Sequence, residues 1–176
     1  AFLYLGGAGA FNTGTDAHYE INQADAEFGT SVAAAGDING DGFSDVIVGA
    51  LRYDNGQTDE GGAFVYYGGS TINAVLDATL EGNQANAAMG NAVTGLGDLN
   101  ADGYADIAVG APLFDGSNSD SGQIFVYLGA AGGIVTAAYK QFDAGVSQPA
   151  RLGFALSAGD FNGDGKLDLV GTGIKQ

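Results

Sequence analysis

The chain has 176 residues, of which 21 are acidic and 5 are basic, so its formal net charge at pH 7 is −16. A surface this acidic excludes binding to nucleic-acid phosphates and electrostatic attraction to an anionic membrane. There is no cysteine, which excludes disulfides and thiolate chemistry. No apolar run approaches 18 residues, which predicts no membrane insertion, and the 45% hydrophobic content predicts a globular domain with a sizeable core.

The chain opens with two short segments that we expect to be strands, 2–5 and 18–22. A longer unit follows. It has a strand at 29–35 rich in Ala, Gly, Ser and Val, and a second at 45–50 that is apolar almost throughout. Such a continuous apolar run is typical of a strand buried on both faces.

A polar crossing loop, 51–62, leads to a third strand at 63–67, and an outer edge strand is expected near 77–81. The same order then recurs with a period close to 60 residues. The later equivalents are 90–96, 106–111, 112–122 (the crossing loop), 124–128 and 137–142, and then 153–159 and 168–172. No segment keeps a helical period, so we expect almost no helix.

A period near 60 with about four strands per unit is typical of a β-propeller. The predicted fold class is therefore all-β, a β-propeller built of four-stranded blades. The segments 2–5 and 18–22 match the third and fourth strands of a blade. The chain is thus expected to be a single propeller unit with the following parts: half-blade 1–27, blade 28–88, blade 89–151 and half-blade 152–176.

A nine-residue loop rich in side-chain oxygens joins the first two strands of each copy. Oxygens at positions 1, 3 and 5, a backbone carbonyl at position 7 and a carboxylate at position 9 can surround one hard cation. A glycine at position 6 allows the sharp turn. The predicted metal ligands are Asp37, Asn39, Asp41, Phe43 and Asp45; Asp98, Asn100, Asp102, Tyr104 and Asp106; and Asp160, Asn162, Asp164, Lys166 and Asp168.

Because every donor is oxygen, calcium fits these loops far better than zinc or copper, and the sequence predicts three Ca²⁺ sites. The competing interpretation is that these are turns stabilised by their own Asx side chains. Three copies with one spacing favour calcium. An EF-hand is excluded by the flank, since Asp45 leads into strand sequence at 46–50 where that motif needs a helix.

Five further side chains are candidates for chemistry. His18 is the single histidine, and the favoured interpretation is a surface residue rather than a member of a catalytic triad. Arg52 and Arg151 lie in loops and are expected to be solvated rather than bound to an acidic ligand. Tyr53 and Phe114 occupy matching loop positions, where they either contact a ligand or pack beneath the loop. No catalytic residue and no organic cofactor site is predicted.

The units resemble FG-GAP repeats, which build the propeller of integrin α-subunits and of many bacterial extracellular proteins. The resemblance is carried by Phe28-Gly29 with Val48-Gly49-Ala50, and by Met89-Gly90 with Val109-Gly110-Ala111. In the third copy Val170-Gly171-Thr172-Gly173 replaces the closing motif.

The resemblance implies a calcium-stabilised, non-enzymatic binding or adhesion module, extracellular or at the cell surface. It places a protein or carbohydrate ligand on the face opposite the calcium loops. Two alternatives stay open: the propeller domain of a secreted enzyme of lyase or phospholipase type, and a purely structural, self-assembling piece.

The sequence contains about three blades' worth of strands, fewer than a closed ring needs. Either the chain is a fragment of a larger propeller, or its half-blades pair between two chains. In the second case a homodimer would complete a six-bladed ring with twofold symmetry.

Overall fold

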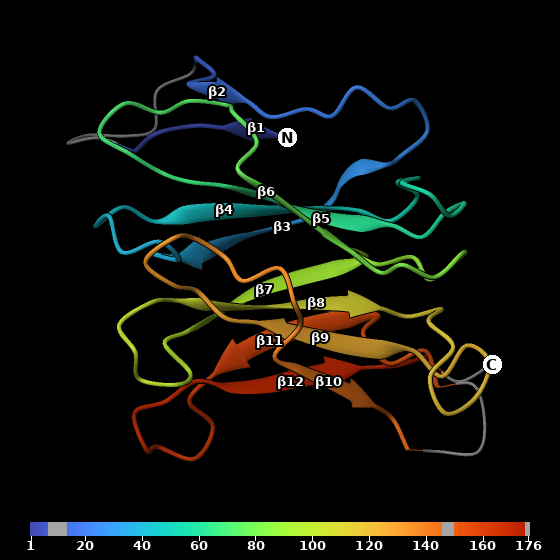
Figure 1. Cartoon of the computed structure of the whole chain (residues 1–176). Coiled ribbons are helices and arrows are strands. Elements are labelled where there is room, and N and C mark those ends of the chain that lie inside the picture. The colour runs from blue at the N-terminus through green and yellow to red at the C-terminus, as the bar shows by residue number, and fades with distance from the viewer. Residues whose placement is uncertain (7–13, 146–149, 175–176) are drawn as a thin grey trace.

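A computed structural model describes residues 1–6, 14–145 and 150–174, and within them all regular structure is β. Two antiparallel four-stranded sheets and two two-stranded ribbons follow one another along the chain (Figure 1). The described strands are β1 Phe2–Leu3, β2 Ala17–His18, β3 Phe28–Gly36, β4 Asp45–Ala50, β5 Gly62–Tyr66, β6 Ala78–Glu81, β7 Ala92–Gly97, β8 Asp106–Ala111, β9 Gln123–Tyr127, β10 Lys140–Asp143, β11 Ala155–Gly159 and β12 Asp168–Thr172.

Each four-stranded sheet is a simple meander, with order β3-β4-β5-β6 in one and β7-β8-β9-β10 in the other. β1 pairs with β2, and β11 pairs with β12. The all-β fold and its blade-like four-stranded sheets confirm the predicted fold class. The predicted strands agree closely with those observed, with two differences: β1 and β2 are shorter than expected, and the outer strand expected at 137–142 is β10, Lys140–Asp143.

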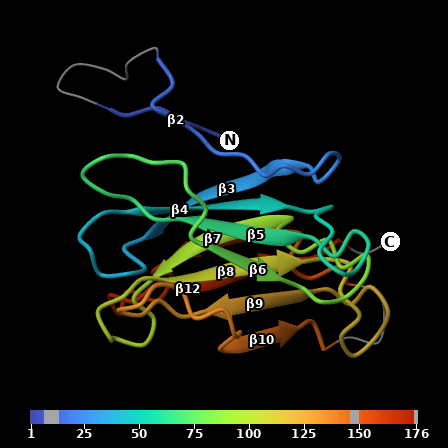
Figure 2. The same ribbon diagram turned by 45° about the horizontal axis from the view of Figure 1, so that its top comes forward.

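The sheets pack face to face in chain order, and Figure 2 shows the same succession from a second direction. One apolar cluster joins β1–β2 to the first sheet, including Tyr19 and Tyr66. A second cluster lies between the two four-stranded sheets and includes Ile47 and Ile107. A third joins the second sheet to β11–β12 and includes Val126. This succession of stacked sheets is how propeller blades bury their faces.

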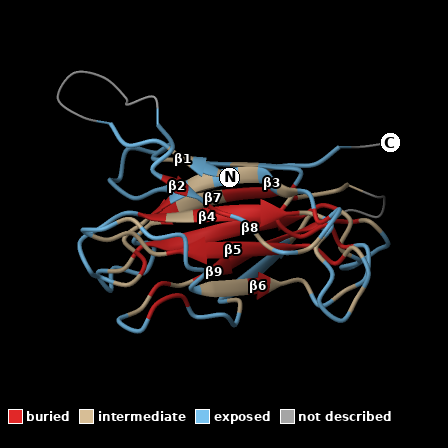
Figure 3. Cartoon of the chain, turned by 90° about the horizontal axis from the view of Figure 1, so that it is seen from above, coloured by how far each residue is buried: buried red, intermediate tan, exposed pale blue. Residues whose placement is uncertain are grey.

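The central strands of each sheet are buried on both faces, which explains their continuous apolar sequences. β5, β8 and β9 are buried at every residue because a sheet covers each of their faces (Figure 3). The first strands of successive units, β3, β7 and β11, lie against one another.

Close approach between sheets depends on small residues. A Cβ at Gly49 would collide with the carbonyl oxygen of Gly90, and a Cβ at Gly110 would collide with that of Gly153. The two glycines that end the repeat motif therefore let the next unit approach. None of the described residues forms a helix of the length and apolarity needed to span a membrane.

Candidate metal centres

The three oxygen-rich loops connect the first two strands of each hairpin, β3 to β4, β7 to β8 and β11 to β12. They lie at one end of the stacked sheets, on the left in Figure 1, while the loops 51–61 and 112–122 lie at the other end. The hairpin registers place the residue before each loop opposite its ninth residue, for example Gly36 opposite Asp45. The strands therefore hold both ends of each loop together.

In the first loop the side chains fold the backbone around themselves. The Asp37 carboxylate accepts hydrogen bonds from the amides of Gly40 at 2.7 Å, Asp41 at 3.0 Å and Gly42 at 2.8 Å. Asp41 accepts from the amide of Phe43 at 2.9 Å and from the Asn39 side-chain amide at 3.0 Å. The result is a compact nine-residue turn that contains backbone carbonyl oxygens, an asparagine side-chain oxygen and aspartate carboxylates.

The other two loops repeat this pattern. Asp98 accepts from the amides of Asp102 at 3.0 Å and Gly103 at 2.8 Å. Asp160 accepts from those of Asp164 at 3.1 Å and Gly165 at 2.9 Å. These amides lower the pKa of Asp160, and the Gly165 amide has the largest effect. One local shape is thus built three times from one residue spacing.

The aspartate at the ninth position ties each loop to its blade. Asp45 is 1% exposed and accepts from the amides of Ile38 and Gly68, both at 2.8 Å. Burial raises the pKa of Asp45, against the opposing effect of the Gly68 and Ile38 amides. Asp106, equally buried, accepts from Leu99 at 2.8 Å and Gly129 at 3.0 Å, and burial raises its pKa too. This residue therefore connects the loop to the end of the third strand.

The donor set of each loop fits calcium. It offers three carboxylates, one side-chain amide and one backbone carbonyl, and calcium takes 6–8 oxygen ligands. In the described residues, however, no three acidic side chains converge on one point, because the carboxylates are turned to the loop's own amides. The assignment of the fifteen residues as ligands stays a prediction.

Comparison with known proteins identifies the repeat. A family model described as "FG-GAP repeat" matches residues 28–66, 89–127 and 152–172, more than half of the chain. The chain belongs to the FG-GAP repeat family. The matches span the hairpins and their loops, and they confirm the resemblance that the sequence indicated.

Curated relatives of two kinds share these FG-GAP repeats. Integrin alpha-PS3 of Drosophila melanogaster is 36% identical over 150 residues, covering 81% of this chain and 13% of that protein. Integrin alpha-5 of Xenopus laevis is 34% identical over 162 residues, covering 87% and 15%. The phosphatidylinositol-glycan-specific phospholipase D of Rattus norvegicus is 35% identical over 164 residues, covering 88% and 19%. The chain thus spans less than a fifth of the length of these relatives.

Neighbouring FG-GAP loops contact one another. The amide of Ala105, at the eighth position of the second loop, donates to the carbonyl of Asp37 at 2.8 Å. The amide of Ala130 donates to the carbonyl of Ile38 at 3.1 Å. The ring of Tyr104 lies against the backbone of Gly40. Backbone hydrogen bonds and the Tyr104 ring therefore join the first two loops.

The FG-GAP blades are also joined at the end opposite the loops, through a contact that sequence reasoning missed. Gln23 accepts from the amide of Asp54 at 2.7 Å and donates to its carbonyl at 2.8 Å. Gln84 does the same with Asp115, at 2.6 Å and 3.3 Å. The separation of 31 residues within each pair, repeated one period later, is the signal that could have revealed them.

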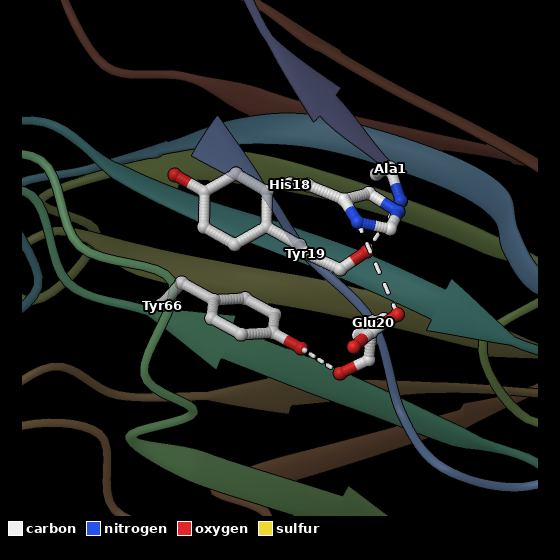
Figure 4. A network of polar contacts seen from close by, with 5 residues as sticks. All are labelled: Ala1, His18, Tyr19, Glu20 and Tyr66. Atoms are coloured by element: carbon white, nitrogen blue, oxygen red, sulfur yellow. Dashed lines mark hydrogen bonds and ion pairs between the residues drawn. The ribbon is translucent and has the colours of Figure 1, made fainter. Parts of the chain in front are cut away.

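His18 lies on the surface, as expected. Figure 4 shows it on β2 with its Nδ1 3.9 Å from the Glu20 carboxylate, and its ring stacks on Phe2 at 4.6 Å. The same figure shows the Tyr66 hydroxyl reaching the carbonyl of Glu20, at 3.5 Å. The Ala1 ammonium donates to the carbonyl of Tyr19 at 2.7 Å. The Tyr66 contact attaches this segment to the first sheet, whereas the other contacts lie within residues 1–20.

The remaining candidates have structural partners. Tyr53 meets Phe64 edge to face at 5.0 Å, and Phe114 meets Phe125 at 5.3 Å, so both loop aromatics pack beneath their loops. Arg52 pairs with Glu27 at 3.2 Å, and Arg151 lies 4.0 Å from Asp120.

Proposed function

We propose that the chain is a calcium-stabilised, non-enzymatic binding module of the adhesion type that works outside the cell. One observation carries this proposal: the same oxygen-rich hairpin loop is built three times with the same internal hydrogen bonds, in an FG-GAP chain that resembles integrin α chains. The module would bind a protein or carbohydrate partner and would neither insert into membranes nor bind nucleic acid.

The role of calcium in this proposal is structural. Each loop carries three carboxylates within nine residues, and their mutual repulsion opposes the compact turn. A divalent ion held by the loop oxygens would remove that repulsion. Since the ninth aspartate is also bonded to the end of the third strand in the first two units, the ion would fix three strands of each blade at once.

The partner would meet the end of the sheets opposite the calcium loops. A pocket of about 520 Å³ reaches this end at Gln23 and Tyr53 and extends to Leu76, two residues before β6. Side-chain amides beside an aromatic ring suit a sugar or a peptide, because they combine hydrogen bonding with an apolar surface. The Gln23–Asp54 and Gln84–Asp115 bridges hold the surrounding loops in place.

Native mass spectrometry with calcium, set beside melting curves with and without a chelator, tests the proposal. Three bound ions per chain and a clear loss of melting temperature on chelation are expected. A chain that takes up no calcium and melts at the same temperature in chelator would overturn the structural role. Glycan and matrix-protein arrays, probed in calcium buffer, then test the binding function.

The similarity to a phospholipase D supports a second candidate, the propeller part of a secreted enzyme. This candidate predicts release of phosphatidylinositol-glycan-anchored protein by residues 1–176. The binding proposal predicts no release above a buffer control.

A further inference from the structure

Three Asn-Gly dipeptides occur in the chain, at Asn39-Gly40, Asn55-Gly56 and Asn162-Gly163. At such a dipeptide the asparagine can react with its own backbone, because the glycine amide nitrogen can attack Cγ of the asparagine side chain and close a succinimide ring. Glycine favours this attack, since it has no side chain to obstruct it and its backbone adopts many conformations. The structure separates the three dipeptides into two that are held and one that is free.

The two dipeptides in the metal loops are held by hydrogen bonds. The amide of Gly40 donates to the Asp37 carboxylate at 2.7 Å, and the side-chain oxygen and nitrogen of Asn39 are both bonded to Asp41. Asn162-Gly163 repeats all three hydrogen bonds in the third loop. A proton is harder to remove from an amide that faces a carboxylate, because the nitrogen anion would meet a negative charge. These two dipeptides therefore react only when their loops open.

Asn55-Gly56 lies in the crossing loop of the first blade, where both residues are exposed. Among the described residues, the amide of Gly56 meets no hydrogen-bond acceptor. A Cβ built on Gly56 would have nothing within 4 Å, so the space around this residue is open. The side-chain nitrogen of Asn55 donates to the Glu81 carboxylate. The attacking nitrogen is thus free and exposed to water, in contrast to those of Gly40 and Gly163.

We propose that Asn55 is a site of spontaneous deamidation and that its conversion opens the crossing loop of the first blade. The Gly56 nitrogen gives up its proton to solvent and bonds to Cγ of Asn55, while the side-chain nitrogen takes a proton from water and leaves as ammonia. Water then adds to one of the two ring carbonyl carbons and breaks its bond to the Gly56 nitrogen, which regains a proton. Opening at Cγ gives aspartate, and opening at the main-chain carbonyl gives isoaspartate. No atom is oxidised or reduced, and water is the co-reactant.

The aspartate product removes a hydrogen bond between the crossing loop and the outer strand. In the unmodified chain Asn55 donates to Glu81, which lies at the end of β6. After deamidation two carboxylates face each other at this contact, and neither can donate. Their repulsion drives the crossing loop away from β6.

The isoaspartate product disturbs a buried carboxylate instead. Glu60 is 0% exposed and accepts from the amides of Asn55 at 2.7 Å and Gln57 at 3.4 Å, which lie on either side of the altered bond. Isoaspartate adds one methylene group to the main chain between these two amides, so they can no longer both keep their places. A buried carboxylate that loses its donors destabilises the loop around it.

The test follows each asparagine separately by mass spectrometry. Residues 1–176 are incubated in calcium buffer at mildly alkaline pH in water enriched in oxygen-18, and are then digested with trypsin in ordinary water. Each residue converted during the incubation carries one heavy oxygen, which separates it from conversion during digestion. The basic residues place the three dipeptides in different tryptic peptides, 1–52, 53–140 and 152–166.

Asn55 should convert about tenfold faster or more than Asn39 and Asn162, because those two must wait for local opening of their loops. In urea the three rates should become similar, since the dipeptide is the same and the hydrogen bonds are gone. If Asn55 converts no faster than Asn39 and Asn162 in the folded protein, it is not the modification site. Conversion of Asn55 needs neither calcium nor a partner, so failure here is distinguishable from failure of the proposed function.

The opening of the loop is tested with Asn55→Asp, which reproduces the aspartate product. This variant should unfold at a lower urea concentration than wild type. Glu81→Gln in the same background should recover most of the loss, because the glutamine amide can donate to the new carboxylate. Asn73→Asp is the matched control, since Asn73 is exposed and its side-chain oxygen accepts from the amide of Val75, as an aspartate also can. An Asn55→Asp variant as stable as Asn73→Asp would overturn the opening of the loop.

Discussion

Tyr104 and Gly40 couple two neighbouring loops. A Cβ built on Gly40 would lie 2.6 Å from Cε1 of the Tyr104 ring, closer than real Cβ contacts come. Gly40 also has a φ of +77°, which a side chain disfavours. At the same position of the second loop, Ala101 has a φ of +62°, so a Cβ is tolerated where no aromatic ring presses on it. The ring, more than the backbone angle, requires glycine at residue 40.

Gly40→Ala should therefore destabilise the protein by about 1–3 kcal/mol, through backbone strain and displacement of the ring. Urea unfolding with the ninth-position aspartates intact measures this cost. Repeating the substitution in a Tyr104→Ala background isolates the contact, since the strain is common to both backgrounds. Equal costs in the two backgrounds would show that the ring contact contributes nothing.

Much of the fold follows from local pattern. The apolar runs at 45–50 and 106–111 predicted the central strands β4 and β8 correctly, because burial on both faces leaves few polar residues. The third run, at 168–172, forms the strand β12, which is only partly buried. The loop spacing located all three hairpin turns. What the sequence could not show is which faces stay uncovered: Val32 and Val93 are the same residue in the same motif, yet one is 61% exposed and the other 8%. That difference depends on the neighbouring sheet, which no local pattern encodes.

Successive repeats use different side chains to accept hydrogen bonds from the amides of their crossing loops. Glu60, 0% exposed, accepts hydrogen bonds from the amides of Asn55, in the first crossing loop, and Asn83, in the connection after β6. In the second blade Ser121, in the crossing loop, stands one period after Glu60, and Asp143 of β10 accepts hydrogen bonds from its hydroxyl and from the amide of Ser117. Ser121 and Asp143 together therefore replace the longer Glu60 side chain, and no local sequence pattern encodes this exchange. Likewise, the sequence placed the donors of the metal loops but could not show that the carboxylates turn to the loop amides.

Asp41→Asn tests the metal loops directly. The substituted side chain keeps an oxygen that can accept from the Phe43 amide, so the fold without calcium should change little. Calcium affinity at that loop should fall by roughly tenfold, because the ligand charge decreases. Calorimetric titration would then show two strong sites and one weak site in place of three alike.

The matched control for Asp41→Asn is Asp115→Asn. Asp115 accepts from the amide of Asp120 at 2.9 Å and lies in a crossing loop at the other end. Both substitutions change the net charge equally. If both weaken calcium binding to the same extent, the effect is general electrostatics, and the first loop is not a calcium site.

Gln84→Ala should cost about 1–2 kcal/mol of unfolding free energy, because it removes two hydrogen bonds that join successive blades. Gln23→Ala, which breaks the equivalent bridge, should cost a similar amount, and the two effects should add since the sites are separate. Chemical denaturation measures all three variants. Gln141→Ala on the exposed face of β10 is the control for the loss of a glutamine side chain. If Gln84→Ala and Gln23→Ala lower the unfolding free energy no more than Gln141→Ala does, the bridges do not stabilise the contact between blades.

Tyr66 should make the fold sensitive to alkali. It is 1% exposed, and burial raises its pKa from 10.0 to about 12. Between pH 10 and about 12 the unfolded chain loses this proton and the folded chain keeps it, so stability is complete below pH 10 and falls as pH rises through that window. The loss attributable to Tyr66 approaches about 2 kcal/mol at the upper end.

Tyr66→Phe should leave stability at pH 7 nearly unchanged, because the hydroxyl makes a single long contact of 3.5 Å. The same variant should lose less stability than wild type as the pH rises from 10 to about 12. Unfolding curves from pH 8 to 12, compared with those of Tyr139→Phe at a half-exposed ring, measure this difference. Equal slopes for Tyr66→Phe and wild type would show that this buried hydroxyl does not control the alkaline limit.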